Sequence, residues 1–134
     1  MDIEILNLKT DIGNNGFLVE FLTEKDVKKN GGFGHMFFVN FKSLNSVRGN
    51  HYHVKQHEYF AVPYGKVKVV LEDIKTKKRK TVILSSEKKN FQMLRVGPNI
   101  AHAVISMSKG SILLGYYKYP HIQNKLDTKE YKLI

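Results

Sequence analysis

The chain contains no cysteine and no run of eighteen apolar residues. The absence of cysteine excludes disulfides, thiolate metal ligands and a thiol nucleophile. The absence of a long apolar run excludes a membrane-spanning helix, which needs about 18 or more such residues. The first residues, Met1-Asp2-Ile3-Glu4, are acidic and do not begin the apolar stretch of a signal peptide. We therefore expect a cytoplasmic protein with no membrane partner.

Acidic side chains are also few. The chain has 12 of them and 22 lysines and arginines, which gives a net charge of +10. Such a surplus attracts anions, and both nucleic acid and a nucleotide diphosphate are candidates. The densest basic run, residues 75–80, has no aromatic residue interleaved for stacking on bases. Because strand-like sequence flanks this run, we predict a solvated hairpin turn there and no nucleic-acid partner.

The length predicts a single domain, residues 1–134. We expect one short helix, Thr23–Lys29, an N-terminal strand within residues 1–10 and a loose C-terminal tail over residues 120–134. Glycine- and asparagine-rich turn signals separate the other segments, which alternate like strands. The predicted strands are 3–8, 16–22, 35–41, 50–54, 57–63, 66–74, 80–85, 91–96, 101–107 and 111–119. Short strands at this spacing predict an all-β sandwich or barrel.

The segment from Arg48 to Glu58 carries most of the recognisable chemistry. His51 and His53 are two residues apart, so on a strand both imidazoles leave the same face. Together with Glu58 and the distant His102 they offer three nitrogens and one carboxylate for a divalent metal of the zinc, iron, manganese or nickel type. The same residues also suit an acid–base histidine in a sugar-binding cleft. The residues alone leave both interpretations open.

The spacing His51-x-His53-x4-Glu58-x6-Gly65, followed by a Gly-Pro-Asn segment and His102, resembles the two-motif signature of cupins. This resemblance implies an all-β cupin (RmlC-like) jelly-roll β-barrel or sandwich whose motif residues point inward. Gly65 would make the tight turn between two strands. Asn99 stands where the second motif usually has its turn glycine, and asparagine tolerates positive φ.

Further segments resemble the sugar-nucleotide branch of the cupins, the dTDP-4-dehydrorhamnose 3,5-epimerase family. They are Asp11 to Phe21, Arg48-Gly49-Asn50-His51-Tyr52 and Gly97-Pro98-Asn99-Ile100-Ala101-His102. Within that branch the chain is most similar to the C-terminal cupin domain of capsular-polysaccharide reductase/epimerases, which ends in a segment like Asp127-Thr128. The 3,4-ketoisomerase group is also similar, but it tends to have an amide where Glu58 stands, which favours a 3- or 3,5-epimerase over a 3,4-ketoisomerase.

The resemblance implies an epimerase or isomerase that removes a proton α to the ketone of a 4-keto-6-deoxy nucleotide sugar, in cell-surface polysaccharide biosynthesis. Arg48 would bind the substrate, His51 would be the base and His102 would line the site. The acid tyrosine of the metal-free epimerases aligns at Gly115, and Tyr117 shares its strand parity, so Tyr117 is the candidate acid. The resemblance also implies a homodimer, and no organic cofactor is expected.

Two alternatives remain for the function, namely another metal-dependent cupin enzyme of the dioxygenase kind and a non-catalytic cupin that binds a sugar nucleotide. A further choice concerns His51, because one imidazole nitrogen cannot ligate a metal and accept a proton through the same lone pair. We expect the other histidines, His35, His57 and His121, to lie outside the site.

Overall fold

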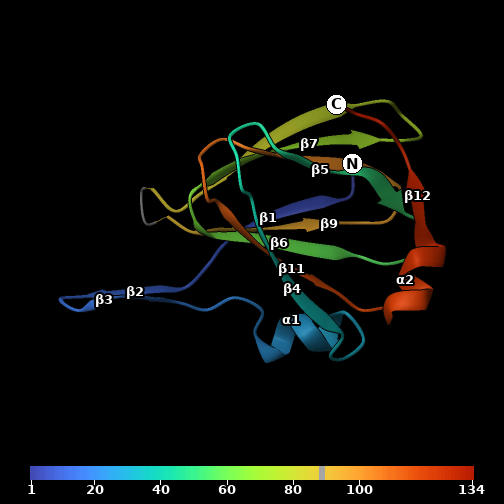
Figure 1. Cartoon of the computed structure of the whole chain (residues 1–134). Coiled ribbons are helices and arrows are strands. Elements are labelled where there is room, and N and C mark those ends of the chain that lie inside the picture. Colours follow the sequence, from blue (N-terminus) through green and yellow to red (C-terminus); the bar gives the residue numbers. More distant parts are fainter. Residues whose placement is uncertain (88–89) are drawn as a thin grey trace.

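The computed structural model describes residues 1–87 and 90–134, and within them two five-stranded antiparallel sheets form the body of the molecule (Figure 1). The first sheet has the order β1 (Ile3–Asn7), β9 (Gln92–Val96), β6 (Glu58–Tyr64), β11 (Ile112–Tyr117) and β4 (His35–Asn40). The second has the order β12 (Thr128–Glu130), β5 (Val47–His53), β10 (Ile100–Ser106), β7 (Lys66–Asp73) and β8 (Arg79–Ser85). Strands distant in sequence are neighbours in both sheets, as in a jelly roll, so the predicted fold class is confirmed.

The core lies between the two sheets. Val67, Val69 and Leu71 alternate along β7 and are fully buried, and they share one apolar cluster with Phe60 and Leu94 of the facing sheet. This is the period-two pattern that the sequence showed over the same strand. Among the described residues, no helix has the length and apolarity needed to cross a membrane.

A hairpin and a helix connect β1 to β4. The hairpin, β2 (Thr10–Gly13) and β3 (Gly16–Val19), forms its own small sheet and extends away from the body in Figure 1. The predicted helix is confirmed as α1 (Glu24–Lys29), and Thr23 caps it in a capping box with Asp26. The strand expected over 16–22 is shorter, because Leu22 has a positive φ of 60° and Thr23 already begins the helix cap.

The basic run lies where the sequence placed it, around the turn between β7 and β8. The carboxylate of Asp73 accepts hydrogen bonds from the backbone N–H groups of Lys75 and Thr76, which closes the turn. The prediction of a hairpin turn is therefore confirmed.

The prediction of a loose C-terminal tail is wrong. Residues after Pro120 form α2 (His121–Asp127) and then β12, which pairs with β5. The side chain of Asn50 on β5 accepts hydrogen bonds from the backbone N–H groups of Leu133 and Ile134. The segment has little amphipathic pattern of its own, and its order comes from pairing with the edge of β5.

Candidate active site

Two strands of one sheet and one strand of the other bring the four predicted ligand residues together. His51 and His53 lie on β5, His102 lies opposite His51 on the adjacent β10, and Glu58 begins β6 in the facing sheet. One potential ligand atom from each residue lies within 4.8 Å of the others. The structure thus assembles the cluster that the motif spacing predicted.

The four residues are not equivalent. Glu58 Oε2 lies 2.9 Å from His53 Nε2 and 3.1 Å from His102 Nε2, and all three side chains are buried. His51 is only partly buried, and its ring packs edge-on to that of His102 with 4.7 Å between centroids. We call His53, Glu58 and His102 the inner trio, against which the less buried His51 packs.

Charge and burial act differently on the carboxylate and on His51. Burial alone would raise the pKa of Glu58, but the imidazoles of His102 and His53 outweigh it and hold this pKa well below its ordinary value. Burial and the nearby His102 lower the pKa of His51 from 6.5 to about 4, against the opposing charge of Glu58. At neutral pH Glu58 is therefore ionised and His51 is a neutral imidazole.

The hydrogen bonding of His102 shows that the inner trio suits a cation. His102 Nδ1 lies 3.1 Å from the carbonyl oxygen of Ile100, to which it can only donate. In a neutral ring Nε2 then has a lone pair aimed at an ionised carboxylate, and among residues 1–87 and 90–134 it has no hydrogen-bond partner. A proton on Nε2 or a metal ion would remove this repulsion, so the three imidazoles and one carboxylate fit a divalent transition metal.

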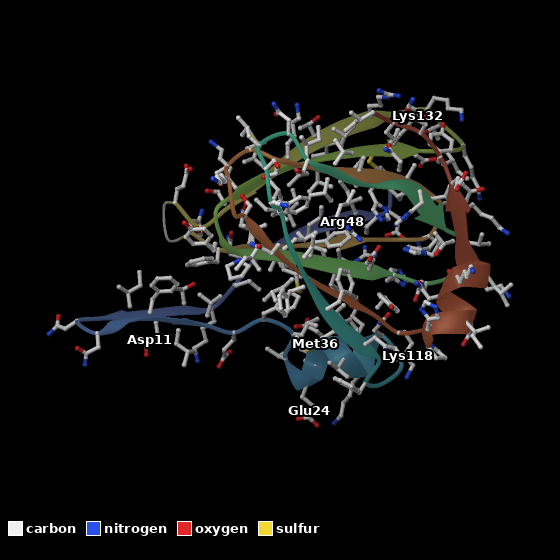
Figure 2. The ribbon with its side chains drawn as sticks, in the orientation of Figure 1. Asp11, Glu24, Met36, Arg48, Lys118 and Lys132 are labelled. Carbon is white, nitrogen blue, oxygen red and sulfur yellow. The ribbon has the colours of Figure 1, made fainter. Side chains whose placement is uncertain are left out.

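A cavity of about 250 Å³ opens beside the cluster. Arg48, His51 and Tyr117 line it together with Glu58 and His102. The remaining lining residues are Phe37, Val39, Gly49, Phe60, Val104 and Leu113. Arg48 is exposed and lies between the two sheets in Figure 2, at the mouth of the cavity.

Arg48 reaches this face because β5 contains a bulge. Residues three apart on a regular strand point to opposite faces, so Arg48 and His51 would be separated. Gly49 and Asn50 both have positive φ, 95° and 60°, and the pairing with β10 shifts at this point. The extra residue returns Arg48 to the face of His51.

Tyr117 lines the cavity, whereas a side chain at position 115 would meet the ring of Phe37. A Cβ on Gly115 would lie 2.0 Å from Cζ of Phe37, so the Phe37 ring covers this position. Tyr117 packs between Phe37 and His35, with its ring stacked on that of His35 at 5.7 Å. His35, which we expected outside the site, is thus next to the candidate acid.

The other expected bystanders lie away from the cluster. His57 is 3.8 Å from Asp2, and His121 is exposed at the start of α2. Tyr52 packs against Tyr131 of the C-terminal segment.

A scan against protein-family models matches residues 1–131 to FdtA, described as WxcM-like, C-terminal. The chain belongs to the FdtA family. This FdtA-family chain has no significant match among the curated proteins.

Solved structures share its fold at low sequence identity. The sugar 3,4-ketoisomerase of Thermoanaerobacterium thermosaccharolyticum, in complex with TDP, is 18% identical over 96% of this chain and 87% of its own, with a TM-score of 0.80. A 3,4-ketoisomerase from Helicobacter canadensis is 22% identical over 96% and 90%, also at 0.80. The dTDP-4-dehydrorhamnose 3,5-epimerase of Bacillus anthracis, with TDP and pyrophosphate bound, is 20% identical over 92% and 76%, at 0.78.

Around His53 the FdtA-family chain has polar partners that the sequence did not reveal. Asp127 accepts hydrogen bonds from the backbone N–H groups of Lys55 and Gln56, which fixes the loop between β5 and β6. Gln56 and Thr128 both approach the ring of His53. The resemblance at Asp127-Thr128 to the reductase/epimerases was the one signal in the sequence that could have drawn attention to this segment.

Proposed function

We propose that the chain is an isomerase of 4-keto-6-deoxy sugars linked to a nucleoside diphosphate, acting in cell-surface polysaccharide biosynthesis, and that His51 removes the proton at C3. One observation carries this proposal: the partly buried His51 and the exposed Arg48 line the same cavity. Proteins with the same fold that bind TDP support the substrate class.

Arg48 and the overall charge suit the nucleotide end of such a substrate. A guanidinium offers several donors in a plane and matches phosphate oxygens well. With a net charge of +10, the molecule attracts a diphosphate before contact. A diphosphate held at Arg48 leaves the sugar to enter the cavity toward His51.

His51 has the properties of a base at this position. Its lowered pKa keeps it unprotonated at neutral pH, so its lone pair is available. When it takes the proton from C3, the nearby ionised Glu58 stabilises the imidazolium, because the Glu58 charge raises the pKa of His51. The ketone at C4 makes the C3 proton acidic, and the resulting charge develops on the C4 oxygen.

The lining of the cavity favours 3,4-ketoisomerisation, in contrast to the epimerisation that Glu58 favoured in the sequence. In ketoisomerisation the proton moves from C3 to the adjacent C4 while the O3 hydroxyl loses its proton and O4 gains one, so one imidazole can serve both carbons on one face. A 3- or 3,5-epimerase must reprotonate carbon from the opposite face, which needs a second group. Gly115, covered by Phe37, has no side chain to offer at the position of the epimerase tyrosine.

A 3-epimerase is the second candidate, and Tyr117 favours it. This tyrosine lines the same cavity as His51 but comes from the facing sheet, so it approaches the sugar from another side. If Tyr117 is the acid, it would deliver a proton to C3 after His51 has removed one.

The deciding experiment is NMR of dTDP-4-keto-6-deoxyglucose incubated with the protein in D₂O. We expect a 3-keto product, with deuterium at C4 wherever the protonated imidazole exchanges with solvent before it protonates C4. Deuterium at C3 of a 4-keto product would instead indicate the 3-epimerase, and deuterium at C3 and C5 the 3,5-epimerase. The His51→Asn variant should show no exchange.

Absence of both a 3-keto product and deuterium exchange, with dTDP- and UDP-linked 4-keto sugars, would contradict the proposal. It would leave the two alternatives, a binding protein without activity or a different metal-dependent cupin enzyme.

We also propose that the cluster holds a divalent metal. His53, Glu58 and His102 would be its ligands while His51 serves as the base, and His51 would be the fourth ligand only if another group removes the proton. Such an ion would act as a Lewis acid toward an oxygen of the substrate. Metal analysis of the purified protein tests this, and less than about a tenth of an equivalent of any transition metal would contradict it. His51→Asn should stop exchange in either case, but it should reduce metal content only if His51 is a ligand.

A homodimer is the proposed assembly. β4 is an edge strand of the first sheet, and its outward side chains Met36 and Phe38 are 53% and 70% exposed. An unpaired edge beside exposed apolar side chains favours contact with another chain.

A further inference from the structure

The ring of His53 is contacted on the side away from Glu58 by Thr128 of the C-terminal segment. Thr128 lies directly opposite His53 in the pairing of β12 with β5. Its Oγ1 is 3.1 Å from His53 Nδ1, while Nε2 of the same ring lies 2.9 Å from Glu58. The two ring nitrogens therefore have separate partners, one in the middle of the chain and one near its C-terminus.

The hydroxyl of Thr128 determines which of the two atoms donates. Thr128 Oγ1 is 2.6 Å from the backbone carbonyl oxygen of Asn124, which can only accept. A hydroxyl has one proton, and here it is given to Asn124. Toward His53 the oxygen can then only accept, so Nδ1 of His53 must carry a hydrogen.

Gln56 is the competing partner and would require the opposite arrangement. Its Oε1 accepts a hydrogen bond from the backbone N–H of Tyr119, so its amide nitrogen faces Asn124 Oδ1 and His53 Nδ1. A bond from this nitrogen to His53 would need an unprotonated Nδ1. The separation is 3.4 Å, beyond the usual range of about 2.7–3.2 Å, and the contact with Thr128 is shorter.

We propose that Thr128 is a positioning residue that fixes His53 with its hydrogen on Nδ1 and so presents Nε2 to Glu58. His102 is held in the same way, but by the backbone carbonyl of Ile100. Both inner imidazoles then offer Nε2 to one carboxylate oxygen, as a shared cation requires. The hydrogen on Nδ1 follows from the contacts of Thr128 with His53 and Asn124, whereas its effect on turnover rests on the proposed function.

The test is long-range ¹H–¹⁵N NMR of the imidazoles in the EDTA-treated protein, with the His53 signals assigned through His53→Gln. In the wild type and in Thr128→Ser we expect Nδ1 of His53 to be protonated. In Thr128→Val, which keeps the shape and strand propensity of threonine, Gln56 becomes the remaining partner, and Nδ1 should lose its proton. A wild-type His53 protonated only on Nε2, or an unchanged Thr128→Val spectrum, would overturn the proposal.

Two matched variants distinguish a positioning role of Thr128 from a general loss of structure. Gln56→Met removes the competing amide and should leave Nδ1 protonated, and loss of that proton would overturn the proposal. Thr10→Val removes a local hydrogen bond on the distant β2 and should change neither the spectrum nor the activity.

Turnover of the 4-keto sugar gives the second measurement. Thr128→Val should lower kcat about tenfold or more with KM nearly unchanged, and Thr128→Ser should restore it. Equal kcat in all three proteins would overturn the positioning role. If the wild type has no turnover, the proposed function fails, and the NMR result still decides the tautomer.

Discussion

His51 packs against the buried inner trio and lines the cavity. Its ring touches the ring of His102, yet one side faces the space where a substrate would lie. This position accounts for its lowered pKa, because burial and a neighbouring imidazole both disfavour the charged form. A base that remains neutral in a cationic protein has its lone pair ready before the substrate arrives.

The lowered pKa of His51 predicts that the folded protein loses stability in acid. Its pKa is about 4 when folded and 6.5 when unfolded, so between these values the unfolded chain binds the proton more readily. The contribution is complete above pH 6.5 and is lost as the pH falls toward 4. It corresponds to about 2 kcal/mol between pH 7 and pH 4.5.

Urea unfolding of the EDTA-treated protein at these two pH values measures the effect. His51→Asn should lose less stability than the wild type over this interval. Glu58, whose pKa is depressed, acts in a lower window, because its contribution is present above its ordinary pKa of 4.5 and is lost below it. An identical loss in the wild type and in His51→Asn would contradict the assignment.

At the scale of elements, the bulge in β5 is the feature on which the site depends most. A Cβ on Gly49 would lie 2.7 Å from the carbonyl oxygen of His102, and its φ of 95° is unfavourable for any side chain. Gly49→Ala must therefore shift β5 against β10 or straighten the bulge. Either change moves Arg48 away from the face of His51.

We expect Gly49→Ala to lower the free energy of unfolding by about 2 kcal/mol or more and to raise KM for the nucleotide sugar. Gly13→Ala is the control, because a Cβ there meets nothing within 4 Å, and it should change stability by less than about 0.5 kcal/mol. Urea unfolding and steady-state kinetics measure both. If Gly49→Ala behaves like the control, the bulge is not required.

The sequence predicted the cluster of histidines and Glu58, but it did not predict the bulge that places Arg48 or the order of the C-terminal segment. Alternation along a strand and the motif spacing were sufficient to predict that His51 and His53 lie at the site. The alternating valines predicted the buried face of β7 in the same way. The position of Arg48 depends on two consecutive positive φ values, which strand parity does not anticipate. The C-terminal segment is ordered by contacts with β5, a partner some 75 residues earlier in the chain.

Position 115 illustrates the same limit. Glycine there was visible in the sequence, but the reason for it is the ring of Phe37 from the paired strand β4. Only the register between the two strands shows that the epimerase tyrosine could not be accommodated.

At the scale of the whole molecule, the edge strand β4 is the proposed contact surface of the homodimer. Its exposed apolar side chains lie on the sheet that also carries Tyr117, so a partner seated there would lie close to that wall of the cavity. Because each copy carries a net charge of +10, association should weaken at low ionic strength, where like charges are poorly screened.

Phe38→Glu should convert the proposed dimer to a monomer, because it places a charge in the contact. Ile83→Glu, on the edge strand of the other sheet, is the control and should leave the assembly unchanged. Light scattering coupled to size exclusion measures the mass of each protein. A monomeric wild type, or a dimeric Phe38→Glu, would contradict the proposed interface.

The contact between Thr128 and His53 also has a consequence for the order of events during synthesis. A chain made from its N-terminus acquires all three histidines of the cluster and Glu58 before it acquires Thr128. Until β12 docks, nothing in the C-terminal segment selects between the two protonation patterns of His53. All four residues of the cluster can therefore be in place before Thr128 contacts His53, and docking of β12 would be the last step in building the site.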